Sequence, residues 1–211
     1  MSSTEYTKLK TKVFGLLEGM TIMDPKYFKV REALIYGETV HTGTRKDGSP
    51  EFSHQMEMLA IAINFHTMML DPYSVYLAII THDMYEDYPQ ILPTLRTKFP
   101  EAEQYSLRLS KYKDTSEREY SSYFREIATC PVSSVVKLID RIHNLSTAPG
   151  AFSNKKMLEY SAEAKQYFLP MLKEARNLHN QRTVYEILKS FLVTEMKIID
   201  KLLGDKDEKT V

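Results

Sequence analysis

The sequence predicts an all-α fold, a single helical bundle of about ten helices, and three observations lead to this class. Apolar residues recur at spacings of three and four along most of the chain, as they do on one face of an α-helix. Pro, Gly and Asx residues divide the chain into segments of helical length. No segment alternates apolar and polar residues as a half-buried strand does, and there is no internal repeat.

The first half of the chain is expected to contain four helices and two shorter helical pieces. The helices are expected at 4–18, from Asp24 to Val40, at 54–67 and at 72–87, and the shorter pieces at 93–98 and 101–111. Residues 44–50 form a polar loop between the second and third helices. Ser53 is expected to cap the third helix, and Asp71 with Pro72 to open the fourth, since these residue types favour those positions.

The second half is expected to contain four longer helices. They are expected from Ser116 to about Thr129, from Pro131 to Leu145, and roughly at 153–177 and 180–203. Pro149-Gly150 separates the second of them from the third, because both residues interrupt helices. The last eight residues are polar, so we expect one domain over residues 1–203 and a flexible tail at 204–211.

Composition limits the classes of function. Lys+Arg 28 and Asp+Glu 28 cancel, which argues against a protein that coats nucleic acid. Cys130 is the single cysteine, so no disulfide can form within the chain and a reducing cytoplasm is expected. The N-terminus lacks the pattern of a signal peptide, and no apolar run is long enough for a membrane helix. We therefore expect a cytoplasmic protein with neither a nucleic-acid nor a membrane partner.

The most informative stretch is His82-Asp83-Met84-Tyr85-Glu86-Asp87, which follows a buried apolar run. Residues four apart share one helix face, so His82 lies on the same face as Glu86. With His54 and Asp140 elsewhere, the stretch provides two imidazoles and two carboxylates, a mixture that suits Mn²⁺, Fe²⁺ or Zn²⁺. Each residue also has a structural interpretation: His54 as a cap or surface residue, and Asp140 as an ion-pair partner of Lys137 or Arg141.

The order and spacing of four blocks resemble the HD-domain metal phosphohydrolases, and more narrowly the (p)ppGpp hydrolase domain of the Rel/SpoT family and the small alarmone hydrolases. The blocks cover roughly residues 24–175. They are His41-Thr-Gly-Thr-Arg45-Lys46 leading to His54, His82-Asp83 followed by Glu86-Asp87, Val136-Lys-Leu-Ile-Asp140-Arg141-Ile-His-Asn144-Leu-Ser-Thr147, and Lys155-Lys156-Met-Leu-Glu-Tyr160.

The resemblance implies a role for each of these residues. His54, His82, Asp83 and Asp140 would hold one Mn²⁺, while Glu86 and Asp87 would orient the bound water and accept its proton. The nucleotide would be bound by Arg45, Lys46, Asn144 and Thr147, and also by Lys111, Lys156 and Tyr160. The implied activity is that of a guanosine-3′,5′-bis(diphosphate) 3′-pyrophosphohydrolase, which releases pyrophosphate and GDP, or GTP from pppGpp.

Several positions depart from the family pattern. Gln55 follows His54 where the family usually has Pro, Tyr88-Pro89 follows Glu86-Asp87 where a small polar residue is common, and Ser146 replaces a long side chain. Two alternatives therefore stay open. One is an HD-domain enzyme acting on another nucleotide, of the 5′-nucleotidase or NADPH phosphatase type. The other is a non-catalytic helical binding module whose charged residues form buried ion pairs.

Overall fold

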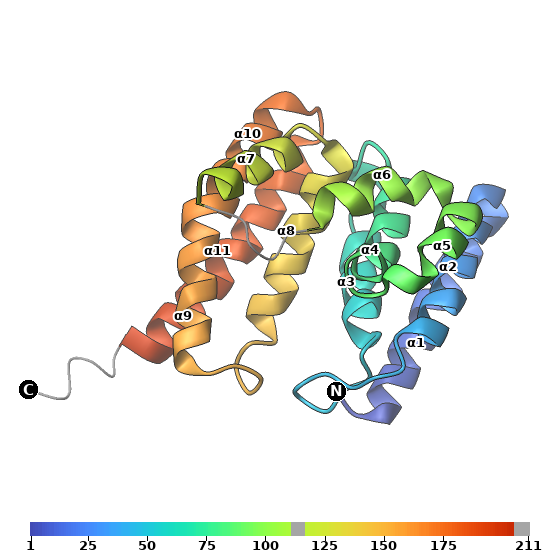
Figure 1. Ribbon diagram of the computed structural model, residues 1–211, viewed down its shortest axis with the longest axis horizontal. Coiled ribbons are helices and arrows are strands. Elements are labelled where there is room, and N and C mark those ends of the chain that lie inside the picture. The colour runs from blue at the N-terminus through green and yellow to red at the C-terminus, as the bar shows by residue number, and fades with distance from the viewer. Residues whose placement is uncertain (111–116, 205–211) are drawn as a thin grey trace, which may run out of the picture. The chain divides into compact units, whose positions relative to one another are not determined.

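The structure, a computed structural model, describes residues 1–110 and 117–204. Contacts divide the chain into two compact units, Met1–Thr115 (unit 1) and Ser116–Val211 (unit 2). All regular elements of the described residues are helical (Figure 1), and the only β contact among them is an isolated bridge between Thr44 and Pro50. The all-α prediction is confirmed, whereas the single-domain organisation over residues 1–203 stays a prediction.

Unit 1 is organised around one buried helix. Its helices are α1 (Ser3–Met23), α2 (Phe28–Val40), α3 (Ser53–Ile63), α4 (Pro72–Asp87), α5 (Leu92–Lys98) and α6 (Pro100–Leu109), with the short 3-10 turns η1 (Pro25–Tyr27), η2 (His66–Met68) and η3 (Pro89–Ile91). Helix α4 packs against α2, α3 and α6. Its apolar run from Val75 to Ile80 is at most 1% exposed, so the polar residues that follow are held on a rigid helix.

The start of α3 differs from the prediction. Ser53 lies inside the helix, and the N-cap position is Phe52, which makes no side-chain capping hydrogen bond. The Ser53 hydroxyl instead donates to the Ser49 hydroxyl at 3.2 Å, which ties the preceding loop to the helix. The helix also ends at Ile63, before the expected residue 67, and a separate 3-10 turn follows.

Unit 2 is organised around α8. Its helices are α7 (Glu117–Ala128), α8 (Pro131–Ser146), α9 (Asn154–Glu163), α10 (Leu169–Leu178) and α11 (Arg182–Gly204), and η4 (Ala164–Phe168) is a π-helical turn. Helix α8 contacts α7, α9, α10 and α11, and it is buried from Val132 to Ile139. The predicted start of α7 at Ser116, and the predicted tail beyond Gly204, lie outside the described residues.

The single helix expected at 153–177 is divided into α9 and α10 by the π-helical turn. Pro170 follows this turn directly, as the second residue of α10. Proline has no backbone N–H and its ring displaces the carbonyl of the preceding turn, so one extra residue is accommodated at this point. No helix in the described parts of the chain is both long and apolar enough to cross a membrane.

The N-cap of α4 gives a test of how that helix is held. Asp71 accepts a hydrogen bond from the backbone N–H of Ser74 at 3.0 Å. Asp71→Ala removes this acceptor and is expected to lower the free energy of unfolding by about 1 kcal/mol. Urea unfolding followed by circular dichroism measures the change. Asp71→Asn keeps an N-cap acceptor and is the matched control; an equal loss in both variants would contradict the capping role.

Candidate metal centre and nucleotide site

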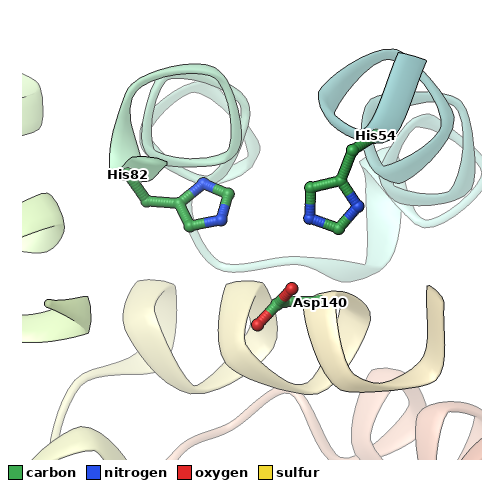
Figure 2. A group of neighbouring side chains, drawn as sticks. All are labelled: His54, His82 and Asp140. Atoms are coloured by element: carbon green, nitrogen blue, oxygen red, sulfur yellow. The ribbon is translucent and has the colours of Figure 1, made fainter. Parts of the chain in front are cut away.

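Two buried imidazoles face each other in unit 1. His54 is the second residue of α3 and is 5% exposed, and His82 lies near the end of α4 and is 7% exposed. Their ring centroids are 6.1 Å apart, and one ligand nitrogen of each lies within 4.8 Å of the other (Figure 2). Two nitrogens bound on opposite sides of one cation at about 2.1 Å would be roughly 4.2 Å apart, so this spacing suits a shared ion.

The backbone determines which nitrogen of His82 is available. Nδ1 lies 2.9 Å from the carbonyl oxygen of Ile79, one turn earlier on α4. A carbonyl only accepts hydrogen bonds, so Nδ1 carries the proton and the neutral ring has its lone pair on Nε2. Nε2 is buried and has no hydrogen-bond partner. A ligating imidazole commonly donates its other N–H to a carbonyl in this way, so His82 is set up as an Nε2 ligand.

Asp83, another predicted ligand, lies next to His82 on α4. Its Oδ1 lies 3.1 Å from His82 Nε2, yet the angle does not make a hydrogen bond, so two lone-pair atoms lie side by side. Its Oδ2 accepts a hydrogen bond from Gln55 Nε2 at 2.6 Å. Two ligands at right angles around a cation, each about 2.1 Å from it, are about 3 Å apart. The donor atoms present therefore fit a divalent cation.

The two predicted acids of α4 lie at its exposed end. Glu86 and Asp87 form the last turn of the helix and are both exposed, unlike His82. They follow the ligand residues by about one turn, as the sequence predicted. Because both side chains are exposed to solvent, they can contact a water molecule. Their role in orienting this water and accepting its proton stays a prediction.

The loop between α2 and α3 presents the predicted basic pair. The backbone N–H of Arg45 donates to the Ser49 carbonyl at 2.8 Å and that of Gly48 to the Arg45 carbonyl at 2.9 Å, which closes a tight turn. Gly48 has φ +79°, a conformation that favours glycine. Arg45 is half-buried and Lys46 is exposed at this turn.

A carboxylate at the base of this loop joins it to the end of α4. Glu51 accepts hydrogen bonds from the Tyr88 hydroxyl at 3.1 and 3.2 Å and from the backbone N–H of Gly43 at 3.1 Å. His41 stacks on Phe52 and meets the Tyr88 ring edge-on. Its Nδ1 is 3.7 Å from Glu51 Oε1, beyond hydrogen-bond distance, and both ring nitrogens are buried without a hydrogen-bond partner.

In unit 2, Asp140 is held by residues of its own helix. Asn144 Nδ2 donates to Asp140 Oδ1 at 2.6 Å, and Lys137 Nζ lies 3.8 Å from Oδ2. Figure 2 shows Asp140 on α8. Lys137 was one of the ion-pair partners expected from the sequence. Asn144, which the resemblance assigned to the nucleotide, thus has a contact that orients a predicted ligand.

Two other predicted nucleotide contacts, Lys156 and Tyr160, lie with Arg141 in a cluster of cations and aromatic rings in unit 2. The Arg141 guanidinium lies 4.4 Å from the ring centroid of Tyr160, and the Lys156 ammonium lies 5.4 Å from the same centroid. Arg141 is 6% exposed and pairs with Glu163. Thr147 donates its hydroxyl to the His143 carbonyl at 2.9 Å. Lys111, which was also predicted to contact the nucleotide, lies outside the described residues.

Sequence reasoning assigned no role to two residues of unit 1 that contact this site. Gln55 and Glu51 bind Asp83 and Tyr88 respectively, across separations of 28 and 37 residues. In the sequence, Gln55 is notable only as a departure from the family pattern. Such long-range contacts have no periodic signal in the sequence, so only the packing of α3 against α4 reveals them.

Comparison with known proteins adds no family assignment: no protein-family model matches the chain, and no curated protein matches it at a significant level.

The burial of His41 predicts a pH dependence of stability. Burial lowers the pKa of His41, and the nearby carboxylates of Asp83 and Glu51 oppose this only in part. Below about pH 6.5 the unfolded chain therefore binds a proton that the folded chain does not. The free energy of unfolding is therefore not reduced by His41 above that pH, and it decreases as the pH drops toward the lowered pKa of His41 in the folded protein.

His41→Gln removes this proton linkage. Urea unfolding at pH values from 7.5 to 5 is expected to show a smaller loss of stability in the variant than in the wild-type protein, whatever their difference at pH 7.5. Equal losses in the two proteins would show that His41 is not held in its neutral form.

Proposed function

We propose that this chain is a metal-dependent (p)ppGpp 3′-pyrophosphohydrolase in which the residues that the resemblance assigns as ligands, His54, His82, Asp83 and Asp140, hold a divalent cation. The observation that carries the proposal is the pair of facing imidazoles on α3 and α4, one with a buried Nε2 that has no hydrogen-bond partner. The order His…His-Asp…Asp along the chain, which resembles the HD-domain phosphohydrolases, also supports it.

Two imidazoles and two carboxylates suit Mn²⁺, Fe²⁺ or Zn²⁺, and the resemblance favours Mn²⁺. When bound, such a cation acts as a Lewis acid toward a phosphoryl oxygen and lowers the pKa of its water. Burial of both histidines keeps the ligand nitrogens away from competing water, and the Ile79 carbonyl holds the His82 ring in the ligating tautomer.

The other residues would bind the nucleotide and move the proton. Glu86 and Asp87 orient a water molecule and accept its proton, because they are exposed just beyond the ligands. Arg45 and Lys46 bind phosphate oxygens, for which a guanidinium offers a forked pair of donors. Water adds to phosphorus, the 3′ ester bond breaks, and ppGpp gives GDP and pyrophosphate. The nucleoside would contact the set formed by Asn144, Thr147, Lys111, Lys156 and Tyr160.

One observation favours a second substrate class, another nucleotide of lower phosphate charge such as NADPH or a nucleoside monophosphate. The Glu51 carboxylate is anchored at the base of the Arg45-Lys46 loop by Gly43 and Tyr88. An acid at this place reduces the positive potential that the loop offers to a highly charged substrate.

Pyrophosphate release is the direct test of the function. Purified protein with Mn²⁺ and ppGpp is expected to release pyrophosphate, and EDTA is expected to abolish the release and lower the melting temperature. Parallel incubations with NADPH and deoxynucleoside monophosphates, assayed for inorganic phosphate, separate the second substrate class. Metal-loaded protein that releases no pyrophosphate from ppGpp would contradict the proposed substrate.

Two variants separate metal binding from proton transfer. Asp83→Ala is expected to lose bound metal, whereas Glu86→Ala is expected to keep it and lose turnover by about 10²- to 10⁴-fold. Elemental analysis of the purified variants and the pyrophosphate assay measure the two effects. Glu18→Ala, an exposed acid on α1, is the control and should retain both. Equal loss of metal from Asp83→Ala and Glu86→Ala would refute the division of roles.

A further inference from the structure

Gln55 contacts a predicted ligand of unit 1 and has no role in the proposed function. It directly follows His54 on α3, it is 1% exposed, and its amide donates to Asp83 Oδ2 at 2.6 Å. We propose that Gln55 is a positioning residue that holds Asp83 as a one-oxygen metal ligand through Oδ1, an inference that rests on the proposed metal centre.

The orientation of the Gln55 side chain follows from its partner. A carboxylate only accepts hydrogen bonds, so the NH₂ end of the amide faces Asp83 and the carbonyl end, Oε1, points elsewhere. Oε1 is buried and has no hydrogen-bond partner. A buried amide oxygen without a partner costs free energy, so stability by itself does not explain an amide at this position.

The hydrogen bond assigns different tasks to the two oxygens of Asp83. Oδ2 accepts the hydrogen bond from Gln55, whereas Oδ1 lies 3.1 Å from His82 Nε2, the nitrogen that is available as a ligand. Asp83 then takes a single coordination position, which leaves room for water or substrate.

Gln55 also couples the ligands of two helices. His54 and Gln55 are consecutive on α3, and His82 and Asp83 are consecutive on α4, which packs against α3. Helix α3 thereby supplies one ligand and also orients a ligand of α4. The competing interpretation is a polar contact that only joins the two helices, and it predicts a loss of stability without a loss of metal affinity.

The test measures Mn²⁺ binding in the absence of nucleotide. Gln55→Leu removes the donor at nearly constant volume and is expected to weaken Mn²⁺ binding by about 10- to 100-fold, as measured by calorimetric titration and by the metal-induced rise in melting temperature. Gln181→Leu is the matched control. Gln181 is a 4% exposed glutamine of unit 2 that donates to the Pro131 carbonyl and the Tyr185 hydroxyl. Its loss should lower the melting temperature but leave Mn²⁺ affinity unchanged.

Each outcome decides between the two interpretations. Gln55→Leu protein that binds Mn²⁺ as tightly as the wild type overturns the positioning role. Gln55→Met, which also lacks the donor but is more flexible, provides the same titration if the leucine variant does not fold. Wild-type protein that binds no Mn²⁺ overturns the inference together with the metal centre. Weakened Mn²⁺ binding by the variant, in a protein that does not cleave ppGpp, supports the inference and refutes only the substrate.

Discussion

The hydrogen bond from His82 Nδ1 to the Ile79 carbonyl fixes which nitrogen of this buried imidazole is available to bind a cation. It forms inside α4, where the apolar residues up to Ile80 are enclosed by α2, α3 and α6. The backbone therefore holds the neutral imidazole in one tautomer, whose lone pair is on the buried Nε2, 3.1 Å from Asp83 Oδ1. Any cation site built on His82 depends on this single constraint.

One carboxylate on each of the two central helices is held in a similar way. Asp83 on α4 receives an amide hydrogen bond from Gln55, and Asp140 on α8 receives one from Asn144. In each case an uncharged amide orients the carboxylate, although Asp140 also has the Lys137 ammonium 3.8 Å away, and Arg141 forms an ion pair with Glu163. Carboxylates held by amides are suited to binding a cation, because an amide orients the acid without displacing the ion.

The proposed metal site and the alternative of a helical module held by buried ion pairs account for different contacts of these residues. The ion-pair interpretation applies to Arg141, and in part to Asp140, which has Lys137 at 3.8 Å. His82 Nε2 and Asp83 Oδ1 lie 3.1 Å apart without a hydrogen bond, and the ion-pair interpretation applies to them only when the imidazole is protonated. Two residues that depart from the family pattern make side-chain hydrogen bonds in unit 1. Gln55 donates to Asp83, and Tyr88 donates to Glu51.

The sequence by itself determined the helical class, most helix boundaries and the residues with metal-binding chemistry, because helical periodicity, N-caps and prolines act over a few residues. It predicted the Asp71 cap and the Pro72 start of α4 correctly. It was wrong about Ser53, whose hydroxyl contacts Ser49, and it did not predict the π-helical turn within the helix expected at 153–177. Only the tertiary structure decided the tautomer of His82, the Gln55–Asp83 pair and the Glu51–Tyr88 contact. The reason is physical: these contacts depend on side-chain directions at helix ends, and two of them join residues that only the packing of separate segments brings together.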